Sequence, residues 1–194
     1  MRPVPWIIDY QTVVDQMRSQ SLRCQYYNSG AFAFEPSAGA RTLGWIGPPD
    51  DSIRPAVRAL ARSVPEPCEP ALAGLALGAW QQHLPGRVWL MPMSHWSHEL
   101  LHGNPEWLPG LIEDIDLDPG LLQNRNNAAA IEFAVGETAG FQMFLQGLLT
   151  MLRGSDFMMA FPSRPVLCMV HHHKQLWWTT SDDRIHQAIQ AILP

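Results

Sequence analysis

The chain has 194 residues, of which 46% are hydrophobic and 16% are charged, and its formal net charge is -5. The high apolar content and the low charge exclude an intrinsically disordered protein. The 13 basic residues include a single lysine and are scattered along the chain, so we expect no nucleic-acid partner.

The cysteines and the N-terminus bear on the cellular compartment. Cys24, Cys68 and Cys168 are far apart and form no C-x-x-C pair, which is not the pattern of a disulfide framework or a cysteine zinc site. No stretch approaches the ~18 apolar residues of a membrane span, and the apolar run before Asp9 is very short. The sequence therefore predicts a cytoplasmic protein with no membrane partner.

Residues 1–65 are expected to form an N-terminal unit of helix, three strands and helix. Apolar residues recur first at helical spacing and then in three short runs separated by turn residues. After the third run, Gly-Pro-Pro-Asp-Asp ends the strand, and Asp50 or Asp51 can cap the second helix. The expected elements are a helix over 8–20, a hairpin of strands over 22–28 and 31–35, a strand over 42–47 and a helix over 53–61.

Residues 66–127 are expected to form a helix-rich middle segment. Three prolines favour an extended connector at its start, and the apolar stretch behind them predicts a buried helix. Ser94 is the expected N-cap of a short helix, which Pro105 ends. The expected elements are a helix over 71–84, a strand over 87–93, a short helix over 95–103 and helical turns over 106–115 and 118–123.

Residues 128–194 are expected to form a C-terminal unit of strand, helix, three strands and helix. Phe141, Phe144, Leu145 and Leu148 keep a helical rhythm, and Gly154 is a typical helix end. The expected elements are a strand over 128–135, a helix over 141–152, strands over 156–161, 165–170 and 175–180, and a last helix capped by Ser181 or Asp182.

The order of elements in the two terminal units suggests an internal duplication. When residues 45–60 are laid over 177–192, Trp45 matches Trp177, and a pair of aspartates precedes each helix. The alternative is that two capped amphipathic helices resemble each other because capping and burial require the same residues. Under either interpretation, the sequence predicts one compact α+β domain with a mainly antiparallel sheet and a helical middle segment.

The most specific local pattern is His98-Glu99-Leu100-Leu101-His102. On a helix, this H-E-x-x-H spacing places two imidazoles one turn apart, where they can bind zinc. The five residues resemble the zincin metallohydrolases, which implies a zinc cofactor, His98 and His102 as metal ligands, and Glu99 as the general base. The flanks depart from that family, because Pro105 ends the helix early and no third ligand stands at the usual spacing.

The same segment also fits a solvated helix face. His95, His98, Glu99 and His102 share one stripe of the predicted helix. His95 lies about 10 Å from His102 along such a helix, so it cannot complete a three-histidine site.

A second histidine cluster, His171 to His173, is expected at the turn between two strands. Such a triplet can bind a metal or can simply be solvated, and the sequence leaves both interpretations open.

Eight tryptophans in a chain of low charge favour an interface function. Trp177 and Trp178 are adjacent on a predicted strand, so they point to opposite faces. Either one of them lies at the surface, or helices cover both faces of the sheet and bury both, and the sequence leaves these two interpretations open. Our leading interpretation is a non-catalytic binding or assembly module that acts through a Trp/Met-rich surface, with itself as a homodimer or with a protein partner. The alternative is a zinc-dependent hydrolase built on His98, Glu99 and His102.

Overall fold

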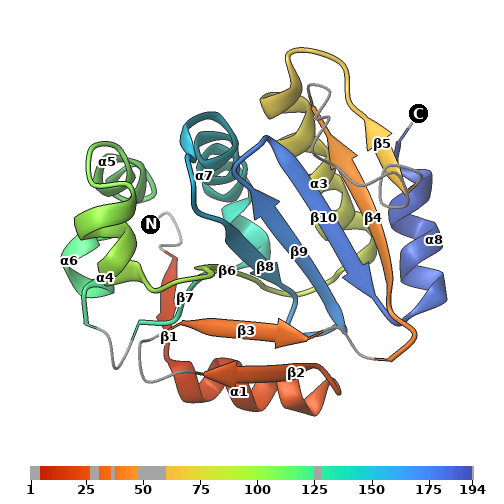
Figure 1. Ribbon diagram of the computed structural model, residues 1–194, viewed down its shortest axis with the longest axis horizontal. Coiled ribbons are helices and arrows are strands. Elements are labelled where there is room, and N and C mark those ends of the chain that lie inside the picture. Colours follow the sequence, from red (N-terminus) through yellow and green to blue (C-terminus); the bar gives the residue numbers. More distant parts are fainter. Residues whose placement is uncertain (1–4, 27–30, 36–37, 48–59, 125–127, 194) are drawn as a thin grey trace.

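The computed structural model describes residues 5–26, 31–35, 38–47, 60–124 and 128–193 (Figure 1). They form helices and a mostly antiparallel sheet, so the predicted α+β class is confirmed. No helix within these ranges has the length and apolar character that a membrane crossing requires. The elements are β1 (Trp6–Ile8), α1 (Tyr10–Ser19), β2 (Arg23–Tyr26), β3 (Phe32–Glu35), β4 (Arg41–Ile46), β5 (Ala61–Ser63), α3 (Cys68–His83), β6 (Val88–Pro92), α4 (Trp96–His98), η1 (Glu99–Gly103), α5 (Leu108–Glu113), α6 (Pro119–Leu122), β7 (Ala130–Phe133), η2 (Val135–Glu137), α7 (Thr138–Met151), β8 (Phe157–Ala160), β9 (Val166–His171), β10 (Gln175–Thr180) and α8 (Asp183–Ala191).

The main sheet has eight strands in the order β1-β7-β6-β8-β9-β10-β4-β5. All neighbouring strands are antiparallel except β4 and β5, which are parallel. The consecutive strands β8, β9 and β10 form a meander near the centre, and strands from the N-terminal residues occupy both edges.

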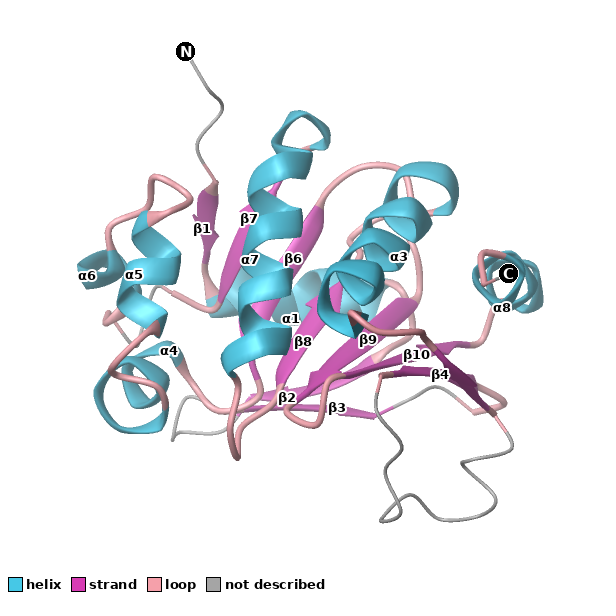
Figure 2. Ribbon diagram, turned by 90° about the horizontal axis from the view of Figure 1, so that it is seen from above, coloured by secondary structure: helices cyan, strands magenta, loops and turns pink. Residues whose placement is uncertain are grey.

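One face of the main sheet packs against α3, α7 and α8, and Figure 2 shows α3 and α7 lying over the strands. Because successive strand residues point to opposite faces, this side receives Val170 from β9 together with Leu176 and Trp178 from β10. The predicted helical rhythm of α7 is confirmed, since Phe141 and Phe144 are both fully buried. The larger hydrophobic core therefore lies between this face and the helices.

The other face is only partly covered, by α1 and by the β2–β3 hairpin, which lie below the sheet in Figure 1. The strands of the hairpin are antiparallel, as predicted. They form a two-stranded sheet of their own. Met17 of α1 and Phe32 of β3 pack here against Met91 and Met158 of the main sheet. This second, smaller core lies between the sheet and the two elements that cover it, α1 and the hairpin.

Aspartate caps begin three of the helices. The Asp182 carboxylate accepts hydrogen bonds from the backbone N–H groups of Arg184 and Ile185, which confirms it as the cap of α8. Asp9 and Asp118 cap α1 and α6 in the same way. Each such cap contributes about 1 kcal/mol because it satisfies a backbone donor that has no partner inside the helix.

Two of the predicted helix boundaries differ from the structure. Most of the helix expected over 53–61 falls on residues outside the described ranges, but Ala61 lies in β5 and pairs with β4. Ser94 does not cap the short helix. His95 does so, because its Nδ1 accepts the backbone N–H of His98 at 2.9 Å.

The predicted internal duplication is not confirmed. In the C-terminal unit, three consecutive strands are neighbours in the main sheet, whereas β2 and β3 form their own sheet apart from β4. Trp45 and Trp177, which the alignment matched, also point to opposite faces of the main sheet. The paired aspartates at 50–51 lie outside the described residues.

Candidate functional site

An apolar groove opens on the second face of the main sheet, beside the β2–β3 hairpin. Its volume is about 340 Å³. The side chains that line it are Phe34, Thr42, Met158, Leu167, Met169, Trp177 and Thr179, and none of these described residues is charged. They come from five strands in two parts of the chain, β3 and β4 near its start and β8 to β10 near its end, so the groove exists only in the folded chain.

Trp177 forms one wall of the groove and is held in place from two sides. Its ring lies flat over Gly44 on the neighbouring strand, where an added Cβ would approach the Trp177 Cζ3 atom to 2.4 Å. Its indole N–H donates a hydrogen bond of 2.8 Å to the Gln175 side-chain oxygen. A glycine at position 44 is therefore required by the close approach of the indole.

Trp178 does not belong to this site. It is 2% exposed and packs in the larger core, with its ring centroid 5.2 Å from that of Trp45 and 5.7 Å from that of Phe161. Trp177 is itself only 9% exposed. The two side chains do point to opposite faces, but the interpretation that one lies at the surface is wrong, and Trp178 is a core residue.

Two threonines add a polar edge to the groove. The hydroxyl oxygens of Thr42 and Thr179 lie 3.1 Å apart on paired strands. One hydroxyl donates to the other, which leaves the second hydroxyl hydrogen and further lone pairs for a bound molecule. The groove thus combines soft apolar walls with one small polar group, as small-molecule sites commonly do.

The H-E-x-x-H segment folds as a single turn of α-helix followed by a π-helical turn. Residues 96–98 form α4 and 99–103 form η1. The ring centroids of His98 and His102 lie 5.9 Å apart, so the two imidazoles are neighbours as expected. Glu99, which follows His98, is the first residue of the π turn.

Glu99 points into the protein and is 1% exposed. Its two carboxylate oxygens accept hydrogen bonds from the Ser94 hydroxyl at 2.5 Å and from the Asn104 amide at 2.6 Å. Asn104 in turn donates to the Ser155 hydroxyl at 2.9 Å. The expected solvated stripe is therefore wrong for Glu99, whose carboxylate has protein donors in place of a metal-bound water.

Among the described residues, two groups of three side chains are close enough together to bind a metal ion, and neither group includes His98 or His102. The first group is His171, His172 and His173, and the second is Glu66, Cys68 and Glu69. The sequence prediction of a metal at His98 and His102 thus has no third ligand among these residues.

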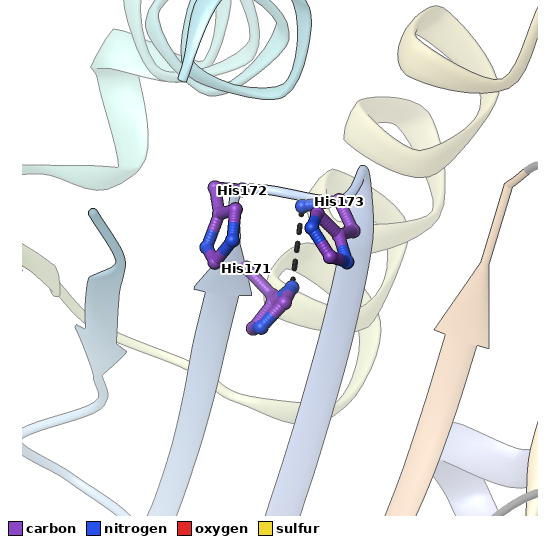
Figure 3. Close-up of side chains that lie close together, drawn as sticks. All are labelled: His171, His172 and His173. Carbon is purple, nitrogen blue, oxygen red and sulfur yellow. Dashed lines mark hydrogen bonds between the residues drawn. The ribbon is translucent and has the colours of Figure 1, made fainter. Parts of the chain in front are cut away.

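The His171–His173 cluster lies at the predicted turn. Figure 3 shows the three imidazoles gathered around the end of β9, and their ring centroids are 4.3 to 5.0 Å apart. Asp156, which precedes β8, accepts hydrogen bonds from the backbone N–H of His172 at 3.0 Å and from its Nδ1 at 2.8 Å. Nothing in the sequence spacing linked Asp156 to this turn.

The second group sits at the start of α3. The Cys68 thiol donates to Glu69, and burial, followed by that hydrogen bond, raises the pKa of Cys68 to about 11. Cys68 is therefore a protonated, poorly nucleophilic thiol near neutral pH. The Glu69 carboxylate accepts a hydrogen bond of 2.5 Å from Lys174, which lowers the pKa of Glu69 and raises that of Lys174.

Comparison of the chain with protein-family models, with curated proteins and with solved structures finds no match.

Proposed function

We propose that the protein is a non-catalytic binding module whose groove holds a small, uncharged and mainly apolar molecule. The observation that carries this proposal is the cavity of about 340 Å³ walled by Trp177, Met158 and Met169. Its volume falls at the lower end of the ~300–1,000 Å³ typical of small-molecule sites.

The burial of the residues that line the groove favours a small ligand over a flat protein surface. Met158, Leu167 and Trp177 are all buried, so only a group that enters the groove can contact them. Binding would remove the remaining apolar surface of ligand and wall from water, at about 25 cal/mol per Å². The unbranched thioether side chains of Met158 and Met169 can adapt to ligands of different shape.

A zinc-dependent hydrolase on His98, Glu99 and His102 remains the alternative, with less support. A general base must face the water that the metal activates. Glu99 instead has both carboxylate oxygens in hydrogen bonds to Ser94 and Asn104.

The groove is tested with 2-naphthol, an uncharged fluorescent molecule with one hydroxyl group. At about 0.4 kcal/mol for each of its roughly 11 non-hydrogen atoms, we expect a Kd between about 0.2 and 1 mM. Met169→Glu should weaken binding by at least about tenfold, because it places a carboxylate in an apolar wall. Equilibrium fluorescence titration measures the Kd of the unmodified protein and that of Met169→Glu.

The matched control is Met143→Glu, which adds the same charge at a residue of α7 that is 40% exposed and lies away from the groove. It should leave the Kd unchanged. Equal weakening by both variants, or no saturable binding to the unmodified protein, would contradict the proposal.

Self-association is a second expectation, and the β1 edge supports it. Trp6 on β1 is 71% exposed, and among the described residues β1 pairs only with β7, so its outer edge is open. An open strand edge beside an exposed indole is suited to pairing with a second copy of the chain. We expect sedimentation equilibrium at micromolar concentration to give about twice the 21.8 kDa chain mass.

Trp6→Ser should then raise the dissociation constant of the dimer by about tenfold or more, as loss of a central interface tryptophan does. Val135→Ser, at another exposed apolar residue, is the comparison for a general loss of surface hydrophobicity. A protein that is monomeric throughout the concentration range would refute this expectation.

A further inference from the structure

We propose that the β9–β10 turn is a binding site for a divalent transition metal, with His171, His172 and His173 as ligands and Asp156 as the residue that orients His172. The site is separate from the apolar groove and from the H-E-x-x-H segment.

The spacing of the three imidazoles is close to that of a bound metal. One ligand atom from each of His171, His172 and His173 lies within 4.8 Å of the other two. A zinc ion with Zn–N bonds of about 2.1 Å holds its nitrogen ligands less than about 4.2 Å apart. Coordination therefore requires the three side chains to move closer together.

The contact with Asp156 prepares His172 for coordination. The Asp156 carboxylate accepts the Nδ1 proton of His172 at 2.8 Å, which leaves the Nε2 lone pair as the ligand atom. Carboxylates in this position recur behind metal-bound histidines, where they fix the tautomer and the ring direction. The same carboxylate also accepts the His172 backbone N–H, so it fixes the main chain of the turn.

Coordination of His171 through Nδ1 requires a local rearrangement. Its Nδ1 accepts the backbone N–H of His173 at 3.2 Å, as the dashed line in Figure 3 shows. Coordination through that nitrogen replaces this hydrogen bond by a metal bond, and the His173 N–H at the exposed turn can then bind water. Binding is therefore expected to change the backbone amide signal of His173.

The turn is anchored on its other side by Lys174, which has a left-handed backbone with φ 59°. The Lys174 carbonyl accepts the N–H of Gly47 at 3.1 Å, and its ammonium group donates to Glu69. The one cationic side chain of the turn is thus paired with a carboxylate. The Asp156 carboxylate beside His172 adds negative charge, which favours a bound cation.

The ligand set selects the kind of metal. Three imidazoles suit Zn²⁺, Ni²⁺ and Cu²⁺, whereas Mg²⁺ and Ca²⁺ require mainly oxygen ligands.

Calorimetric titration of the untagged, chelator-treated protein with ZnCl₂ tests the site. We expect one Zn²⁺ per chain, and the double variant His172→Ala/His173→Ala should weaken binding by at least about 30-fold. Asp156→Ala should weaken it by about tenfold, and Asp156→Asn should restore most of the loss, because the amide oxygen can still accept the Nδ1 proton. Imidazole ¹⁵N shifts should report the Nδ1–H tautomer of His172 in the unmodified protein and its loss in Asp156→Ala.

The control is His98→Ala/His102→Ala, which removes the other pair of neighbouring histidines and should leave the affinity within about twofold. Circular dichroism of each variant establishes that it is folded. The proposal is overturned if zinc up to about 1 mM gives no saturable binding. It is equally overturned if binding survives in His172→Ala/His173→Ala and is lost in His98→Ala/His102→Ala.

Discussion

Replacing Glu99 with alanine is expected to lower the free energy of unfolding by about 3 kcal/mol, because it removes the acceptor of two charge-assisted hydrogen bonds inside the protein. The Asn104 amide would lose its bond to Glu99 while remaining buried. Glu99→Gln should cost only about 1 kcal/mol, because its amide oxygen accepts from Asn104 and its amide nitrogen donates to the Ser94 hydroxyl. Urea denaturation followed by circular dichroism measures the free energy of unfolding of the parent protein and of the two variants.

A substitution at Gly103 tests the position of the Glu99 carboxylate more strictly. A Cβ at position 103 would approach a Glu99 carboxylate oxygen to 2.3 Å, so Gly103→Ala should cost about 1–3 kcal/mol. In the Glu99→Ala background that clash is gone, and the cost of Gly103→Ala should largely disappear. Strict additivity of the two changes would show that Glu99 does not lie where the structure has it. A Glu99→Ala protein as stable as the parent would lead to the same conclusion.

Alanine variants of Trp177 and Trp178 are expected to differ in their effects on stability and on binding. Trp178→Ala should lower the free energy of unfolding by about 4 kcal/mol, because it empties a core position between Trp45 and Phe161. Trp177→Ala should cost less, about 2 kcal/mol, because one side of its ring faces the groove. Urea denaturation gives both values.

For 2-naphthol binding, we expect the Trp177 variant to be affected more than the Trp178 variant. Trp177→Ala removes a wall of the groove and should weaken binding by about tenfold, whereas Trp178→Ala should change the affinity of the folded protein less than about twofold. If Trp178→Ala weakened binding more than Trp177→Ala, the groove would be the wrong site.

Much of the fold could be predicted because local patterns and tertiary packing agree. The rhythm of α7, the three apolar runs that form β8 to β10 and the Asp182 cap of α8 are local patterns, and the structure has the elements that they predict. The β2–β3 hairpin was also predictable, but not that it leaves the main sheet to cover its second face. Strand order depends on long-range pairing, which short patterns in one sequence do not carry.

The candidate site was less predictable for the same reason. The two-residue repeat of a β-strand places Trp177 and Trp178 on opposite faces of the sheet but does not say which face is more open. In the structure, helices cover the face that carries Trp178. The H-E-x-x-H spacing assumes a regular α-helix, whereas residues 99–103 form a π turn and Glu99 is buried. Asp156 reaches His172 only because β8 and β9 are antiparallel neighbours.

The most direct measurement of the proposed groove is methyl NMR of protein labelled with ¹³C at the methionine methyl groups. Met158 and Met159 are consecutive in β8 but face opposite sides of the sheet, and only Met158 lines the groove. On titration with 2-naphthol, the methyl signals of Met158 and Met169 should shift and saturate together, while that of Met159 stays unchanged. A shift of Met159 without Met158, or saturable binding that leaves Met158 and Met169 unaffected, would contradict the proposed function.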